Sequence, residues 1–228
     1  MKYSGKARQA AFKLIIWTLI ALIAIFVIGI FGAMLATAIA ATSVFLIVVW
    51  LAFSVFTLFF FRDPTPRVPS GPGLVVSPAH GKVDAIEEIT ESKFMGGPCR
   101  RVSVFLSIFN VHVQNAPVRG KITFFKYTTG EFLSALKAES AEHNENLYLG
   151  IESAERPGAR IGVRLIAGVL ARRIVPFVSE GDELERGERI SLIQFGSRTD
   201  LYLPMEAQIK VKLGDKVSGG QTIMASFA

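Results

Sequence analysis

Few side chains in this sequence have the types and spacing for covalent chemistry, and the first to consider is Ser197, which follows Gly196. A serine hydroxyl attacks a carbonyl near neutral pH only when a base takes its proton. Imidazole titrates near that pH, so one of the histidines of the chain could serve as this base. A Gly-Ser pair alone is common in turns. Its meaning therefore depends on the segments around it.

Metal chemistry is not expected. The three histidines, His80, His112 and His143, are widely spaced and match no metal-binding motif. Cys99 is the only cysteine, which excludes an intramolecular disulfide and a multi-cysteine zinc site. We therefore predict no structural metal.

An uncharged apolar segment precedes all of these residues. From Leu14 to Phe61 there is no Asp, Glu, Lys, Arg or His over 48 residues. As a helix this run would be roughly 72 Å long, whereas one membrane crossing needs about 20 residues. It is too long for a signal peptide. The sequence predicts two transmembrane helices within residues 1–61, with a turn in the small-residue stretch from Gly29 to Ser43.

The flanks of this segment predict its orientation. Four basic residues (Lys2, Lys6, Arg8 and Lys13) precede it, and Arg62 and Arg67 follow it. Positive flanks favour the cytoplasmic side, and two crossings place both flanks on one side. We therefore expect a soluble domain on the cytoplasmic face of the cell membrane. The formal charge of +6 fits an anionic membrane surface. No basic cluster interleaved with aromatics indicates nucleic acid.

Residues 62–228 are predicted to form a mainly β (α+β) domain. Short segments rich in Val, Ile and Phe, mostly bounded by Gly or Pro, indicate strands. They are residues 74–77, 82–89, 101–107, 121–127, 161–170, 174–178, 190–195 and 200–203. Residues 131–146 indicate the one soluble helix. The segment 178–190 is repeated at 211–223 with a shared Gly-Asp turn. This repeat resembles the hairpins of barrel-sandwich folds and implies no chemistry by itself.

Six motifs in order carry a more specific resemblance. They are Phe60–Pro64, Ser77–Val83, Ser107–Val113, Ile166–Ile174, Gly187–Arg189 and Phe195–Pro204. Together they resemble the short, membrane-anchored form of the phosphatidylserine decarboxylase family, from about Phe60 to the end of the chain.

The resemblance implies a pyruvoyl-dependent carboxy-lyase that makes its own cofactor. The Ser197 hydroxyl would attack the Gly196 carbonyl, and the bond between them would be cut. The two fragments would stay together, and Ser197 would become a pyruvoyl group that serves as an electron sink. The substrate would be phosphatidylserine or a related serine phospholipid in the bilayer, and the product phosphatidylethanolamine. A homodimer is a fair expectation.

The resemblance also implies roles for individual residues. His112 matches the family histidine that serves self-cleavage or substrate proton transfer. Arg172 or its neighbour Arg173 would bind the lipid phosphate, and adjacent strand residues face opposite ways, so at most one would reach the site. Arg198 would meet the substrate carboxylate or phosphate, or lie at the surface. Asn115 and Gln114 stand where short family members usually have Arg and Asn, and would still orient groups by hydrogen bonds.

His80 is the main departure from the family pattern, Ser-Pro-Ala-Asp-Gly, whose acid orients the histidine in self-cleavage. A neutral imidazole cannot stabilise an imidazolium as a carboxylate does. Either His80 acts as a base itself, or Asp84 substitutes for the acid, or the chain is a slow or uncleaved relative that binds lipid. A further alternative is a membrane-anchored carrier or adaptor module without catalysis, although no modifiable lysine at a hairpin tip is evident.

Overall fold

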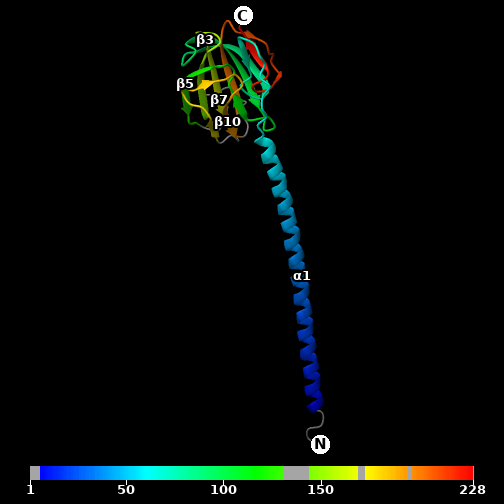
Figure 1. The fold of residues 1–228 in the computed structure, drawn as a ribbon. Helices are drawn as coiled ribbons and strands as arrows, with labels where there is room; N and C mark the ends of the chain where they lie inside the picture. Colours follow the sequence, from blue (N-terminus) through cyan, green and yellow to red (C-terminus); the bar gives the residue numbers. More distant parts are fainter. Residues whose placement is uncertain (1–5, 131–143, 169–172, 195–196, 228) are drawn as a thin grey trace. The chain divides into compact units, whose positions relative to one another are not determined.

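The computed structural model describes residues 6–130, 144–168, 173–194 and 197–227 (Figure 1). The chain divides into one unit up to Thr57 and a compact domain from Leu58 onward, and each is described by itself. The first unit is helical, and the second is built from strands.

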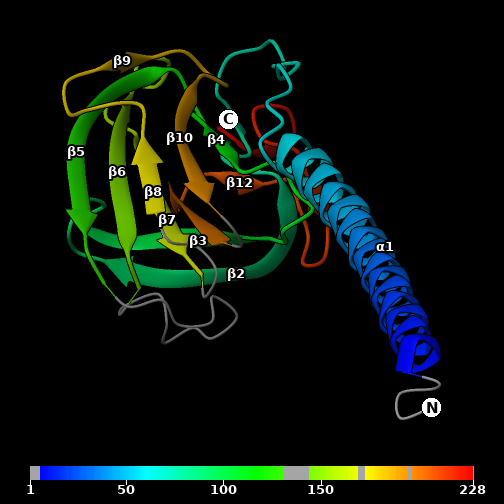
Figure 2. The same cartoon turned by 90° about the horizontal axis from the view of Figure 1, so that it is seen from below.

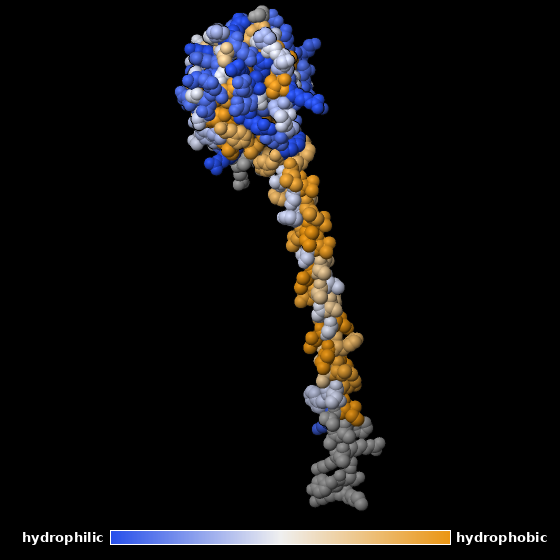
Figure 3. Space-filling model, viewed as in Figure 1, coloured by the Kyte–Doolittle hydropathy of each residue, from blue (hydrophilic) through white to orange (hydrophobic). Residues whose placement is uncertain are grey.

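Helix α1 runs from Lys6 to Phe60 without interruption. Its stretch Ile15–Phe60, 46 residues, is long and apolar enough to cross a membrane by length and composition. In Figure 3, hydrophobic side chains cover most of the visible face of this helix. Most large apolar side chains of α1 are exposed. A helix packed in the core of a soluble protein would instead bury such side chains.

The turn predicted near Gly32 is not present, because the helix continues through residues 29–43. The segment contains no proline, and a glycine in a helix interior costs only about 1 kcal/mol relative to alanine. Most small residues there are alanines, the best helix formers. The Thr37 and Thr42 hydroxyls donate to the carbonyls of Met34 and Ala38 in the preceding turn, so they also fit the helix.

The domain is dominated by one curled antiparallel sheet (Figure 2). Its strand order is β13-β2-β3-β11-β7-β6-β5-β9. The bounds are Lys216–Val217, Gly81–Glu91, Gly97–Leu106, Ser197–Pro204, Arg160–Ala167, Asn146–Ser153, Gly120–Thr128 and Glu183–Leu184, in that order. The predicted mainly β domain is confirmed.

The described part of the domain also contains two smaller antiparallel sheets. One has the order β4-β10-β8, with bounds Val113–Asn115, Arg189–Gln194 and Arg173–Pro176. The other has the order β1-β14-β12, with bounds Leu74–Val76, Ile223–Ser226 and Gln208–Ile209. The first of these carries the strand that leads to Ser197.

The central strands are buried on both faces, which explains one missed strand. The apolar core packs on one side of β6, β7 and β11. An aromatic cluster of Phe94, Tyr148 and Tyr202 covers the other side. All residues of β6 except Glu152 are buried, so its sequence lacks the alternation that marks a half-exposed strand. The helix predicted at 131–146 falls largely outside the described residues.

The sequence repeat forms two matching turns, and they give the large sheet a pseudo-twofold symmetry. Gly181 donates its N–H to Ile122 O, and Gly214 donates to Val83 O, both at 2.8 Å. Both glycines have positive φ, 98° and 92°, which a residue with a side chain rarely adopts. The first turn leads into β9 beside β5, and the second leads into β13 beside β2. From either edge inward, a two-residue strand is therefore followed by three longer ones: β13-β2-β3-β11 from one edge and β9-β5-β6-β7 from the other.

Two glycines mark the closest backbone approaches of this symmetric arrangement. A Cβ on Gly81 would lie 2.2 Å from Phe105 O, and a Cβ on Gly120 would lie 2.2 Å from Glu152 O. Both obstacles are backbone atoms, which cannot rotate away. The two halves of the sheet therefore share the same requirement for glycine.

We predict that Gly81→Ala and Gly120→Ala each destabilise the domain by about 1–3 kcal/mol, because the added methyl group overpacks a rigid contact. The measurement is the melting temperature of the detergent-solubilised chain. Gly97→Ala is the matched control, since nothing lies within 4 Å of its Cβ position. Equal melting temperatures for all three variants would contradict the close approach.

Candidate active site

Ser197 is the first residue of β11 and lies between two neighbouring strands. It is paired with Leu106 of β3 on one side and with Ala167 of β7 on the other. The residue is fully buried, and its Oγ has no hydrogen-bond partner among the described residues. An unpartnered hydroxyl in a buried position is costly and is available for a reaction. Gly196 lies outside the described residues.

Arg198 is buried beside this serine in a network of carboxylates. Its Nε lies 3.0 Å from Asp200 Oδ1, and its Nη1 lies 3.2 Å from Asp84 Oδ2. Burial raises the pKa of the Asp84 carboxyl, and the Arg198 charge partly offsets that effect. Asp84 thus pairs with Arg198 rather than with a histidine, and the contact of Arg198 with substrate stays a prediction.

His112 is fully buried in the segment before β4. Its ring lies 4.2 Å from the Phe60 ring, centroid to centroid, and its Nδ1 lies 2.9 Å from Asn110 O. A carbonyl can only accept, so Nδ1 carries the proton in the neutral ring and Nε2 is the basic nitrogen. Burial, aided by the Arg62 charge and opposed by the hydrogen bond to the Asn110 carbonyl, lowers the pKa of His112 to about 4. The imidazole is therefore neutral near pH 7.

The His112 segment is tied to the strand that leads to Ser197. Its carbonyl accepts a hydrogen bond from the N–H of Ile193, in β10 and four residues before Ser197. Gln114 Nε2 also donates to this carbonyl, and Ser191 donates its hydroxyl to Gln114 Oε1. These contacts fix the chain around the histidine.

His80 is half-buried immediately before β2, next to Asn115. A Cβ on Gly219 would lie 2.9 Å from His80 Cδ2 and 2.6 Å from Asn115 Oδ1, so both side chains press on this glycine. Asn115 Nδ2 donates to Gly187 O. Burial lowers the pKa of His80, Arg62 lowers it further, and Asp63 opposes them. Arg62 is thus close enough to both histidines to favour their neutral forms.

A cavity of about 540 Å³ opens beside His80. Its lining includes Arg62, Lys82, Phe105, Asn110 and Lys216. Phe105 directly follows the core residue Val104 and precedes Leu106, the strand partner of Ser197, and adjacent strand residues face opposite sides of the sheet. No group of three or more His, Cys, Asp or Glu side chains in the described parts of the chain is placed to hold a metal ion.

The structure brings His80 and Asn115 together and places His112 within the influence of the same arginine. Arg172 lies outside the described residues, and Arg173 is exposed. The sequence analysis missed Arg62, Lys82 and Lys216 as site residues. The first two stand inside motifs that carried the family resemblance, and Lys216 follows the Gly-Asp turn of the repeat. Only the fold shows that they line one cavity.

Comparison with known proteins agrees with this arrangement. The family profile described as phosphatidylserine decarboxylase matches residues 53–225. A phosphatidylserine decarboxylase proenzyme of Desulfotalea psychrophila is 42% identical over 179 residues, covering 78% of this chain and 83% of that protein. The proenzyme of the same name from Symbiobacterium thermophilum is 43% identical over 195 residues, covering 85% and 90%.

A third relative gives the same result from another organism. The phosphatidylserine decarboxylase proenzyme of Gluconobacter oxydans is 44% identical over 180 residues, covering 78% of this chain and 79% of that protein. Matches of this identity and coverage, together with the family profile, place the whole β domain in one family. The chain belongs to the phosphatidylserine decarboxylase family.

Proposed function

We propose that this chain is a proenzyme that cuts itself between Gly196 and Ser197 and then decarboxylates phosphatidylserine to phosphatidylethanolamine. The observation that carries the proposal is the buried, unpartnered Ser197 hydroxyl at the start of a central strand. The names of the relatives, which are proenzymes, support it.

The cut begins at Ser197. Its hydroxyl attacks the Gly196 carbonyl carbon and replaces the peptide bond by an ester, while a neutral base takes the hydroxyl proton. Removal of the Ser197 Cα proton then expels the Gly196 carboxylate. Addition of water and loss of ammonia leave a pyruvoyl group at the start of the 197–228 fragment. His112 is the proposed base, because it is neutral near pH 7 and close to the strand before Ser197.

The surroundings of Ser197 fit a pyruvoyl group at this position. The Ser197 side chain is fully buried with no competing hydrogen bond in the described residues, and its backbone is held by strands on both sides. A pyruvoyl group supplies an electrophilic carbonyl for the substrate amine and an electron sink for the carbanion that loss of CO₂ leaves. The chain's own contribution is to bind the headgroup, to exclude water and to place a proton donor.

We predict that Ser197→Ala leaves one uncut chain without decarboxylase activity, because no ester can form. The unchanged chain should give a 32-residue fragment that begins at position 197, with a blocked terminus that reacts with hydrazines. Intact mass and carbonyl labelling measure both outcomes. Decarboxylation by a chain whose 196–197 bond is intact would refute the mechanism.

His80 stands where the family has aspartate, and this predicts slow maturation. We expect His80→Asp to speed cleavage at pH 8, because a carboxylate offsets the positive charge that develops on His112. The loss of an orienting acid can lower a rate about 10⁴-fold, so its return should have a large effect. The unchanged chain should cleave at a constant rate from pH 8 down to about 5.5, since the pKa of His112 is about 4.

The added carboxylate should also raise the pKa of His112, so the rate of His80→Asp should begin to fall at a higher pH. His80→Asn is the matched control without charge and should show neither effect. A time course of the 32-residue fragment at several pH values measures both. Equal rates and pH profiles for all three chains would show that another group orients the base.

We propose that residues 1–61 anchor the enzyme in the cell membrane with the β domain on the cytoplasmic side. The apolar stretch of 46 residues is roughly 69 Å long as a helix, more than twice the about 30 Å of a hydrocarbon core. Although α1 is continuous in the structure, we propose that in a bilayer it breaks within residues 29–43, so that the chain returns to the starting side and this surface stays out of water. This return also keeps the basic residues of both flanks on the cytoplasmic side.

We predict that a cysteine at position 36 reacts with a membrane-impermeant maleimide added to intact cells, whereas one at position 68 reacts only after lysis. The variants are Ala36→Cys and Val68→Cys in a Cys99→Ser background. Labelling at position 68 in intact cells, with none at position 36, would indicate a single crossing and an external domain.

A further inference from the structure

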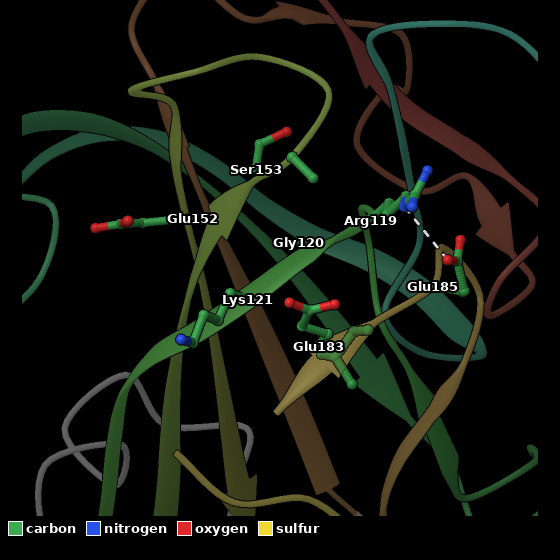
Figure 4. Close-up of a pocket in the computed structure, with 9 residues that line it drawn as sticks. Arg119, Gly120, Lys121, Glu152, Ser153, Glu183 and Glu185 are labelled. Atoms are coloured by element: carbon green, nitrogen blue, oxygen red, sulfur yellow. Dashed lines mark ion pairs between the residues drawn. The ribbon is translucent and has the colours of Figure 1, made fainter. Parts of the chain in front are cut away.

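Two cavities lie at pseudo-equivalent places of the large sheet. The first, beside His80, includes Lys82 of β2 and Lys216 of β13. The second has a volume of about 320 Å³ and includes Lys121 of β5 and Glu183 of β9 (Figure 4). The pseudo-twofold symmetry relates Gly81 to Gly120, Lys82 to Lys121 and Lys216 to Glu183, because the matching turns and strand pairs have the same register. The two cavities share a backbone frame and differ in charge.

The charge difference is centred on one cross-strand pair. Lys216 lies directly opposite Lys82, whereas Glu183 lies directly opposite Lys121. Directly opposed residues in an antiparallel pair have Cβ atoms about 5 Å apart, and like charges there are destabilising. The first cavity therefore keeps an unfavourable lysine pair where its counterpart has an attractive one.

Neighbouring residues do not neutralise the lysine pair. Neither Lys82 nor Lys216 forms an ion pair within the described ranges. The next residues across the sheet are Phe105, which is uncharged, and Arg198, whose charge is taken by Asp200 and Asp84. Arg62 adds a third cation to the cavity lining.

The counterpart row alternates in sign. Next to Lys121 comes Glu152 and then Arg160. A further ion pair in this cavity joins Arg119 to Glu185 at 3.2 Å, drawn as a dashed line in Figure 4. The lining of the second cavity contains three acidic and two basic residues, so it has no excess of positive charge. Of these two cavities, the first alone carries an excess of positive charge, which indicates an anionic ligand there.

We propose that Lys82 and Lys216, together with Arg62, bind the phosphodiester group of the substrate. The inference rests on the proposed function and adds the subsite that holds the lipid headgroup. Lysine binds phosphate as a point charge, and arginine adds directed N–H groups. Arg62 follows the end of α1 by two residues, so the cavity lies close in the chain to the apolar anchor. In a bilayer, the phosphate of a lipid lies at the boundary between hydrocarbon and water, where an apolar anchor ends.

The decisive variant is Lys216→Glu, which gives the first cavity the residue of its counterpart. We expect KM for dihexanoylphosphatidylserine, used as dissolved monomers, to rise about tenfold or more through loss of charge-assisted phosphate contacts, with kcat little changed. The same variant should melt a few degrees higher than the unchanged chain, because it replaces a like-charge pair by an opposite-charge pair. A merely structural lysine would not give both effects.

Glu183→Lys is the matched control. It creates a lysine pair opposite Lys121 in the second cavity, so the melting temperature should fall while KM stays unchanged. Binding is also measured without catalysis in the uncut Ser197→Ala chain. Inorganic phosphate should raise the melting temperature of this chain, and the added Lys216→Glu change should abolish that rise. Should Lys216→Glu fail to fold, Lys216→Gln replaces it in both assays.

The possible outcomes separate this inference from the proposed function. An unchanged chain that neither cuts itself nor decarboxylates the lipid overturns the proposed function. A chain that does both, with wild-type KM in Lys216→Glu, overturns the phosphate subsite alone. Stabilisation by inorganic phosphate together with an unaltered KM would assign the cavity to free phosphate and would equally overturn the lipid subsite.

Discussion

A buried guanidinium holds the two sides of the candidate site together. Arg198 lies between Asp200 of its own strand and Asp84 of β2, and its side chain is only 9% exposed. A buried charge that loses its partner costs several kcal/mol, so β11 and β2 are constrained to this arrangement across β3. Ser197 directly precedes Arg198, and His80 lies four residues before Asp84. The same ion pairs therefore limit how far the serine and this histidine can move apart.

Equivalent positions in the two halves of the pseudo-twofold sheet show which residues the fold requires and which are candidates for chemistry. Features common to both halves, such as Gly81 and Gly120 at the closest backbone contacts, serve the architecture. Features found in one half alone are candidates for function. His80 and Lys216 stand where the other half has Arg119 and Glu183.

The sequence predicted much of the fold, because most strands are short, apolar and bounded by glycine or proline. It missed β6, which is buried on both faces, and the strands β4, β9, β12, β13 and β14, which have only two to four residues each. The turn expected in α1 rested on glycines, which a helix tolerates. At the site, Ser197, His112 and His80 follow from local motifs. The pairing of Lys82 with Lys216 depends on strand register over more than a hundred residues, which no local pattern contains.

The position of strand β11 inside the large sheet determines whether the two fragments can separate after cleavage. A chain cut before Ser197 would leave β11 hydrogen-bonded between β3 and β7, and β14 between β1 and β12. Leu201 and Met224 would stay in the core. The short piece could dissociate only if the large sheet opened, so exchange of pieces between molecules would be as slow as global unfolding. Separately made pieces would instead expose bare strand edges that invite aggregation. Folding must therefore come first, and scission second.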